Sequence, residues 1–359
     1  MAFNPSSISK LMVRATNWVG DAVMSLPALR AIRATLPGAQ VAVVARPGVA
    51  DLYYREECID RVIVYPPHKG LRSRFDFAAT LRAEHFDAAI LLQNAFDAAL
   101  LAWLARIPVR IGYDRDARGV LLTRAIAVPE PGDIPRHQRF YYLELLRRAG
   151  WIDSFPACEA IRLGGSDAAR EAGLRRLSAI GIAGPIIGIS PGAAYGNAKR
   201  WLPERFAEAA TRIARPHQAG VLVFGSAGER PLCGEVAERI RSASVKACNL
   251  AGETTLGEFV DLAATCRVFL TNDSGAMHVA SALGVPTLAV FGATDDVATG
   301  PTGPLARVIR EHTECSPCLL RECPIDHRCM TRVTVDHVAE AALHLWEETA
   351  ARWTQEARS

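Results

Sequence analysis

The amino-acid sequence predicts an α/β protein built from two halves, each a parallel β-sheet covered by helices. Short apolar runs typical of buried strands alternate with segments of helical periodicity, and this alternation occurs twice along the 359 residues. A stretch that mixes proline, glycine and serine, residues 150–167, separates the two series. Half of the residues are hydrophobic, which is enough to fill two cores. We therefore expect two Rossmann-like domains that face each other across a cleft.

The first half begins with a strand and a helix joined by a turn. The turn reads Asn17-Trp18-Val19-Gly20-Asp21, and the helix after it contains Pro27, which should kink it or tighten its first turn. The predicted strands are residues 11–15, 41–45, 62–65 and 88–92, and the first and last predicted helices are residues 21–36 and 137–149. We expect this domain to cover residues 1–155.

The second half repeats the alternation. The predicted strands are residues 186–189, 221–224, 246–250, 268–270 and 285–291, and the predicted helices are residues 204–213, 229–240, 256–265 and 276–283. We expect this domain to cover residues 156–335. A closing helix, residues 335–346, and a polar tail would occupy residues 336–359.

The composition, and the absence of the common nucleotide-binding and hydrolase motifs, argue against several classes of protein. A formal net charge of +3 does not suggest a nucleic-acid binder, and no signal peptide or apolar run of membrane-spanning length is visible, so we expect a cytoplasmic protein. The sequence has no G-x-G-x-x-G after the first strand, no G-x-x-x-x-G-K-[ST] and no G-x-S-x-G. Dehydrogenase, P-loop phosphotransferase and α/β-hydrolase activities are therefore disfavoured.

Small and polar residues follow the strand at residues 268–270. Asp273, Ser274 and Gly275 come first, and His278 lies one helical turn after Ser274 on the same face. The end of a strand and the start of a helix meet here, which is where α/β sheets bind ligands and where free N–H groups attract phosphate. The alternative is that Asp273 or Ser274 only caps the helix.

A second loop, residues 190–201, follows another strand. Gly192 permits close approach of the backbone, and Lys199 and Arg200 supply the positive charge that a diphosphate leaving group needs. A solvated face is the alternative for these two cations. Ser226, in a glycine-rich loop after the next strand, is a weaker candidate for a base or ribose pocket.

The first turn supplies the candidate base. Gly20 would let the chain turn tightly, and Asp21 would stand at a helix start facing the cleft, where its carboxylate can act as a general base. A plain N-cap aspartate is an equally good interpretation from the sequence alone.

Three segments together resemble one family. They are residues 17–47, NWVGDAVMSLPALRAIRATLPGAQVAVVARP, residues 190–210, SPGAAYGNAKRWLPERFAEAA, and residues 271–295, TNDSGAMHVASALGVPTLAVFGATD. In order and spacing they resemble the motifs of the ADP-heptose:lipopolysaccharide heptosyltransferases, glycosyltransferase family 9. Residues 314–330, ECSPCLLRECPIDHRCM, are similar to a cysteine-bearing segment in the members that add the second heptose. The resemblance implies a GT-B fold with the nucleotide sugar held mainly by the C-terminal domain. Nothing in the loops resembles a D-x-D metal site, so we expect no cofactor and no catalytic metal.

The resemblance also implies roles for residues. Asp21 matches the family's proposed general base, Lys199 a lysine near the donor diphosphate, and Asp273, Ser274, Gly275 and His278 its donor loop. Ala194 and Tyr195 stand where some members carry two threonines, so hydroxyl contacts to phosphate are in doubt there. The implied mechanism is a single inverting displacement in which Asp21 deprotonates the acceptor hydroxyl and ADP leaves from the opposite face.

The implied partners are ADP-heptose and a lipopolysaccharide inner-core acceptor, heptosyl-Kdo2-lipid A, at the inner membrane face. Arg72 and Arg74 are our candidates for the acceptor's anionic groups, beside His68 and Lys69, with Arg115, Arg118 and Arg124 in a second basic stretch. Solvated charge is the alternative for each. Another core heptosyltransferase, a GT-B transferase with a different nucleotide sugar, and a nucleotide-sugar epimerase or binding protein remain open.

The nine cysteines pose a separate question. Cys315, Cys318, Cys323 and Cys329 are spaced C-x2-C-x4-C-x5-C, with His327 among them, and this spacing permits a tetrahedral zinc site. The alternative is an irregular loop of reduced cysteines that act as small hydrophobic residues.

Overall fold

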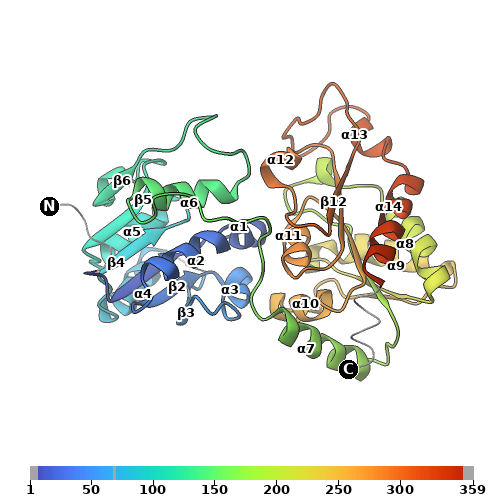
Figure 1. The fold of residues 1–359 in the computed structure, drawn as a ribbon, viewed down its shortest axis with the longest axis horizontal. Helices are drawn as coiled ribbons and strands as arrows, with labels where there is room; N and C mark the ends of the chain where they lie inside the picture. The colour runs from blue at the N-terminus through green and yellow to red at the C-terminus, as the bar shows by residue number, and fades with distance from the viewer. Residues whose placement is uncertain (1–6, 68–69, 351–359) are drawn as a thin grey trace. The chain divides into compact units, whose positions relative to one another are not determined.

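The computed structural model describes residues 7–67 and 70–350 and divides into two compact units, Met1–Cys158 and Glu159–Ser359. Each unit contains one six-stranded parallel sheet with helices on both faces (Figure 1). His68 and Lys69, two of the predicted basic residues, lie outside the described residues. The predicted fold class, α/β with two Rossmann-like domains, is confirmed.

Unit 1 has the strand order β3-β2-β1-β4-β5-β6. Its strands are β1 (Lys10–Arg14), β2 (Gln40–Ala45), β3 (Arg61–Val64), β4 (Ala88–Leu91), β5 (Val109–Tyr113) and β6 (Arg124–Ile126). Its helices are α1 (Val19–Met24), α2 (Leu26–Thr35), α3 (Pro47–Tyr53), α4 (Leu71–Ala83), α5 (Phe96–Leu104) and α6 (Arg139–Arg148). Apolar residues with no exposed surface, such as Val13, Val43 and Ile90, pair in register across β2, β1 and β4.

Two predictions for unit 1 need correction. The single helix predicted at residues 21–36 is two helices that meet at Ser25, and Pro27 stands in the first turn of the second, where its missing N–H costs no hydrogen bond. Strands β5 and β6 were not predicted. They are short, and each carries an arginine, Arg110 and Arg124, within a run that lacks the apolar pattern of a buried strand.

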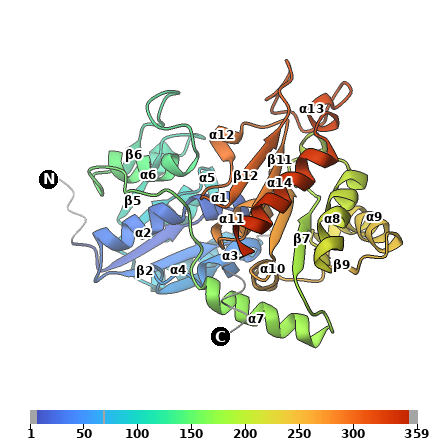
Figure 2. The same cartoon turned by 45° about the vertical axis from the view of Figure 1, so that its right-hand side comes forward.

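Unit 2 has the strand order β12-β11-β10-β7-β8-β9. Its strands are β7 (Ile186–Ser190), β8 (Gly220–Val223), β9 (Ala247–Asn249), β10 (Val268–Asn272), β11 (Thr287–Phe291) and β12 (Ala306–Arg310). Its helices are α7 (Ser166–Ala179), α8 (Pro203–His217), α9 (Arg230–Ser242), α10 (Leu256–Ala263), α11 (Gly275–Ala282), α12 (Asp296–Thr299), α13 (Arg328–Thr331) and α14 (Val335–Glu348). In Figure 2, helices α8, α9 and α14 lie together beside this sheet.

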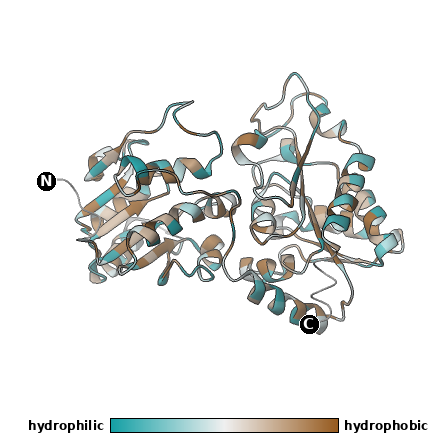
Figure 3. Ribbon diagram, viewed as in Figure 1, coloured by the Kyte–Doolittle hydropathy of each residue, from teal (hydrophilic) through white to brown (hydrophobic). Residues whose placement is uncertain are grey.

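Helix α14 belongs to the core of unit 2. It packs against α8 and against strands β10 and β11, and its Leu345 and Trp346 are buried in the same apolar cluster as Ile187 of β7. Many helices alternate between hydrophobic and hydrophilic residues, as Figure 3 shows, which is the pattern of helices that cover a sheet on one side. Within residues 7–67 and 70–350, no helix is both long enough and apolar enough to cross a membrane.

The two sheets share one topology, and it places the sites. In each, the first strand of the unit lies between the second and the fourth, so the order reverses beside β1 in unit 1 and beside β7 in unit 2. Ligands of open α/β sheets bind at the carboxyl ends of the strands at such a reversal. The predicted loops at Asp21, Lys199 and Asp273 follow β1, β7 and β10, the strands at these two points.

Candidate functional site

Three loops of unit 2 converge on one carboxylate. The Lys199 Nζ atom lies 2.6 Å from Oδ2 of Asp273, and the hydroxyl of Thr294 donates to the same oxygen at 2.7 Å. The side chains of Lys199 and Asp273 are only 15% and 6% exposed, so Lys199 does not lie on a solvated face. The loops after β7, β10 and β11 thus form one charged cluster, in which Thr294 was not predicted from the sequence.

Asn272 holds two of these loops together. It is the last residue of β10 and has no exposed surface. Its amide nitrogen donates to the carbonyl of Pro191 at 2.7 Å, and its carbonyl accepts the N–H of Trp201 at 2.9 Å. Both ends of the Lys199 loop are therefore fixed to the strand that precedes Asp273. A buried asparagine whose amide nitrogen and carbonyl oxygen both have partners costs little to bury and fixes the position of the loop.

Gly192 and Ser226 meet at Glu229. A Cβ atom at Gly192 would lie 2.0 Å from Oε1 of Glu229, so a larger residue here would require the Glu229 side chain to move. The backbone N–H and the hydroxyl of Ser226 both donate to Oε2 of Glu229, at 2.9 and 2.8 Å. Ser226 therefore shapes the loop after β8 through an internal hydrogen-bond pair. Arg200 lies 3.8 Å from the same carboxylate.

The N-terminus of α11 carries the remaining donor-site candidates. Ser274 is the N-cap residue, but its hydroxyl lies 3.1 Å from the hydroxyl of Thr271 and does not cap the helix. Gly275 is the first helical residue, and His278 is buried one turn further on. The capping alternative that we considered for Asp273 and Ser274 is therefore wrong. The first amides of α11 point to the carboxyl end of the sheet beside the Lys199–Asp273 pair.

The cysteine-rich stretch shows no metal-binding geometry. All nine cysteines are free, and burial raises the pKa of the Cys329 thiol, with the three neighbouring thiols adding to the shift. Among the residues that the structure describes, no three His, Cys, Asp or Glu side chains are placed to hold a metal ion.

In unit 1, Asp21 is paired with a tyrosine from a distant helix. Trp18 is the N-cap of α1 and Asp21 lies in the first turn, so the N-cap alternative for Asp21 is also wrong. The hydroxyl of Tyr142, on α6, donates to Oδ1 of Asp21 at 2.8 Å. Burial, then the charge of Asp21 and this hydrogen bond, raise the pKa of Tyr142 well above its usual value, so Tyr142 stays a donor. Gly20 is helical, and the turn falls at Asn17 and Trp18.

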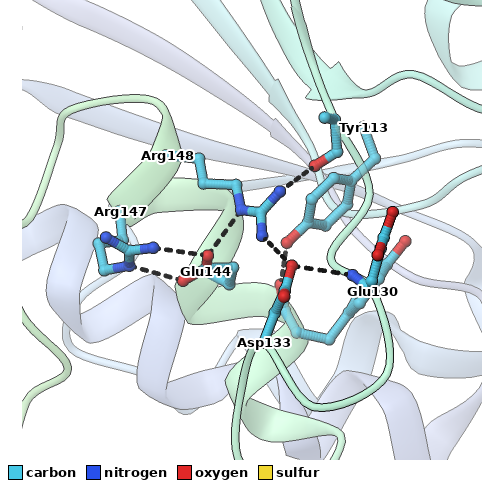
Figure 4. A network of polar contacts seen from close by, with 8 residues as sticks. Tyr113, Glu130, Asp133, Glu144, Arg147 and Arg148 are labelled. Atoms are coloured by element: carbon cyan, nitrogen blue, oxygen red, sulfur yellow. Dashed lines mark hydrogen bonds and ion pairs between the residues drawn. The ribbon is translucent and has the colours of Figure 1, made fainter.

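Helix α6 carries a buried acid that pairs with two arginines of the same helix, and one of these arginines ties the helix to the loop before it. The side chain of Glu144 has no exposed surface and accepts hydrogen bonds from Arg147 at 2.7 and 2.8 Å and from Arg148 at 2.6 Å (Figure 4). Arg148 also donates to Asp133 at 2.7 Å, which ties the preceding loop to the helix. Burial alone would raise the pKa of Glu144, but the two arginines outweigh it and hold that pKa below its usual value. Tyr142 therefore projects from a fixed helix.

The basic residues predicted to contact the acceptor differ in their surroundings. Arg118 has no exposed surface and donates to the carbonyls of Tyr113 and Gln93, and burial lowers its pKa to about 10, so its prediction as a surface cation is wrong. Arg74 donates to Asp97 at 2.7 Å. Arg72 is exposed on α4.

A hollow in unit 2 lies away from this chemistry. It has a volume of about 560 Å³ and is lined by the end of α8, including Arg215 and Gln218, and by the starts of β8 and β9, with Lys246 before β9. That is the edge of the sheet opposite the Lys199–Asp273 pair. Because ligand sites of this fold occur at the carboxyl ends of the strands, we place the functional site at the charged cluster.

Comparison with known proteins identifies the class of this protein. Residues 74–328 match the model of glycosyltransferase family 9 (heptosyltransferase). Since the match covers more than half of the chain, the protein belongs to this family and is a glycosyltransferase.

Individual members of the family are similar to this chain along most of their length. The chain is 33% identical over 308 residues to lipopolysaccharide heptosyltransferase 2 of Salmonella typhimurium, covering 84% of this chain and 88% of the relative. It is 30% identical over 325 residues to lipooligosaccharide heptosyltransferase 2 of Haemophilus influenzae, with the same coverage of each. The structure of ADP-heptose lps heptosyltransferase II of E. coli matches with a TM-score of 0.80 and 28% identity, over 95% of this chain and 99% of that one.

Proposed function

We propose that this protein transfers heptose from ADP-heptose to the first heptose of the lipopolysaccharide inner core, on a heptosyl-Kdo2-lipid A acceptor. The observation that carries the proposal is the Lys199–Asp273–Thr294 cluster at the strand reversal of unit 2, beside the start of α11. A partly buried lysine and free helical amides are suited to the diphosphate of a nucleotide sugar. The relatives that match along most of their length carry the corresponding activity in their names.

The proposed donor site stabilises the leaving group. As the bond between the anomeric carbon and ADP breaks, negative charge grows on the diphosphate, and Lys199 with the first amides of α11 stabilises that charge. Asp273, itself held by the hydroxyl of Thr294, keeps the ammonium group of Lys199 in place, so little reorganisation is needed at the moment of reaction. Because these groups supply the positive charge, we expect transfer to continue in the presence of EDTA.

Asp21 is the proposed general base. It takes the proton of the acceptor hydroxyl as that oxygen attacks the anomeric carbon, and the configuration there inverts. Tyr142 donates to Oδ1 of Asp21 at 2.8 Å, which holds the carboxylate in position for this proton transfer. The acceptor is bound by unit 1, with Arg72 on α4 contacting its anionic groups, and the protein works at the cytoplasmic face of the inner membrane.

Two acceptors test the proposal. Transfer from ADP-heptose would be measured to an acceptor that ends in Kdo and to one that ends in Kdo-bound heptose, with ADP release as the readout. We expect clear preference for the heptose-terminated acceptor. Preference for the Kdo-terminated acceptor would assign the protein to an earlier step of core assembly. Faster turnover with a UDP-sugar would contradict the proposed donor, and ADP binding without acceptor-dependent release would contradict transferase activity towards this acceptor.

A further inference from the structure

The stretch from Glu314 to Cys329, which we call the cysteine-bearing segment, is bound to the Lys199 loop. The N–H of Ala198, next to Lys199, donates to the carbonyl of Arg321 at 3.0 Å, and Nε2 of His327 lies 3.0 Å from the carbonyl of Ala198. A Cβ atom at Gly196 would lie 2.2 Å from the carbonyl oxygen of Arg321. The two stretches therefore run in direct backbone contact.

The same segment is bound to the Thr294 loop. The N–H of Leu319 donates to the carbonyl of Ala293 at 2.8 Å, and the hydroxyl of Ser316 donates to the carbonyl of Gly292. Lys199 and Thr294 are the two groups that hold Asp273. The cysteine-bearing segment thus tethers both loops that position the proposed diphosphate site.

Tyr195 brings a second cation to this site. Its hydroxyl donates to the carbonyl of Leu319 at 2.9 Å, so the ring is fixed against the segment. The ammonium of Lys199 lies 5.1 Å from the centre of that ring, and the guanidinium of Arg321 lies 5.3 Å from it. Both cations therefore make cation–π contacts with the same ring, that of Tyr195.

The two cations differ in how they are neutralised. Lys199 is paired with Asp273, whereas Arg321 is exposed and makes no ion pair with a carboxylate among the residues that the structure describes. Arg321 therefore keeps a positive charge that is available to an anionic ligand bound beside Lys199. A guanidinium also presents paired N–H groups that match two oxygens of one phosphate.

We propose that Arg321 binds the diphosphate of the nucleotide-sugar donor together with Lys199, so that the cysteine-bearing segment forms part of the donor site. This inference rests on the proposed donor function of the Lys199 loop. Tyr195 then has a defined role there: its hydroxyl secures the segment and its ring places both cations. Arg321 contacts the ligand directly and acts as a binding residue.

Binding of ADP and of adenosine to the full-length protein tests this role. We expect Arg321→Ala to weaken ADP binding about 10-fold, the scale of one lost charge-assisted hydrogen bond, and to leave adenosine binding unchanged. Arg321→Lys should recover part of the loss, and raised salt should reduce the difference from wild type. Arg175→Ala, which removes an exposed arginine on α7 of the same unit, is the matched control and should leave both affinities unchanged.

The results distinguish failure of the role proposed for Arg321 from failure of the proposed transferase function. If Lys199→Ala weakens ADP binding and Arg321→Ala does not, the donor site stands and the role of Arg321 is refuted. An equal loss of ADP and adenosine binding in Arg321→Ala, with a lowered melting temperature, would make the residue structural and overturn the proposal. If the wild-type protein binds no ADP, the proposed function itself fails.

Discussion

Units 1 and 2 have the same sheet topology but build their sites in different ways. In unit 2 the groups that surround Asp273 come from loops at the ends of neighbouring strands, and Lys199 and Thr294 bond to it directly. In unit 1 the group that holds Asp21 comes from α6, 121 residues further along the chain. A shared fold therefore fixes where a site lies, while the partner of each functional side chain depends on the elements packed around it.

The use of arginine differs in the same way. In unit 1 the guanidinium groups of Arg14 and Arg118 have no exposed surface and bond to backbone carbonyls at the ends of β1, β4 and β5. In unit 2 Arg321 is exposed beside the cluster. Unit 2 also uses arginines internally, as Arg205 donates to the carbonyls of Thr331 and Val333, so the contrast concerns the residues around the two sites. Variants of residues in unit 1 and in unit 2 test the comparison.

Asp21→Asn should have the largest effect. We expect kcat to fall by about 10²–10⁴-fold, because an amide cannot accept the acceptor's proton, while the affinity for ADP-heptose stays near wild type. Steady-state kinetics and calorimetric binding of the donor would measure the two. Asp76→Asn, an exposed acid on α4, is the control. Near-normal kcat in Asp21→Asn would reduce Asp21 to a structural acid of α1.

Lys199→Ala should come next, with kcat/KM lowered on the order of 100-fold. The charge contacts the diphosphate in both the ground state and the transition state, so donor KM should rise and kcat should fall together. Lys246→Ala, at an exposed lysine of the same unit, should change neither. If both constants of Lys199→Ala matched wild type, the cluster would not be the donor site.

Tyr142→Phe sharpens the comparison, because it removes only the distant partner of Asp21. The hydroxyl stabilises the charged carboxylate, so its loss makes Asp21 easier to protonate. The acidic limb of the pH–kcat/KM profile should move to higher pH, and activity at neutral pH should fall only a few-fold. A uniform loss at every pH would show that Tyr142 acts through packing alone.

Glu144→Gln should lower stability more than activity at saturating substrate. The folded-state pKa of Glu144 is below its usual value, so the stabilisation is fully present above the unfolded-state pKa and is lost as the pH falls through the folded one. We expect the free energy of unfolding to fall by about 1–2 kcal/mol at neutral pH. The loss is this small because both arginines are partly exposed, so solvent weakens the ion pairs. Urea unfolding at pH 7 and pH 3.5 would measure it. A deficit as large at pH 3.5 as at pH 7 would contradict the ionic origin.

Arg72→Ala should have the smallest effect, a two- to threefold rise in acceptor KM at low salt, roughly the effect of one exposed charge, that disappears at raised salt. Arg82→Ala, at an exposed arginine near the end of the same helix, is the control. An acceptor KM indifferent to both salt and Arg72 would remove this residue from the acceptor site and leave the donor site unaffected.

The sequence predicted the fold and the loop positions because both depend on local patterns. Apolar runs and helical spacing located most strands, and the loops at Asp21, Lys199 and Asp273 stood out as small or charged residues after a strand. Thr294 lies within residues 271–295, the third segment that resembles the family, yet no neighbouring residue in the sequence indicates that its hydroxyl bonds to Asp273. Tyr142 gave no signal at all, because its role arises only when α6 packs against α2 and brings the tyrosine hydroxyl to Asp21.

The same dependence on packing explains why the sequence does not show which arginines and lysines are buried. Arg118 and Arg72 look alike in the sequence, and only the packing of the β4 and β5 loops turns one into a buried donor to carbonyls. The Lys-Arg pair at 199–200 would be a solvated face by composition alone, whereas Asp273 and Glu229 draw both side chains inward.

Two glycines of the Lys199 loop differ in how freely evolution can replace them. At Gly192 the obstacle is the carboxylate of Glu229, a side chain, so a larger residue can be accepted if position 229 becomes smaller at the same time. At Gly196 the obstacle is the backbone carbonyl of Arg321, which every amino acid carries. Among descendants of this protein, positions 192 and 229 should therefore change as a pair, while position 196 stays glycine for as long as the cysteine-bearing segment follows its present path.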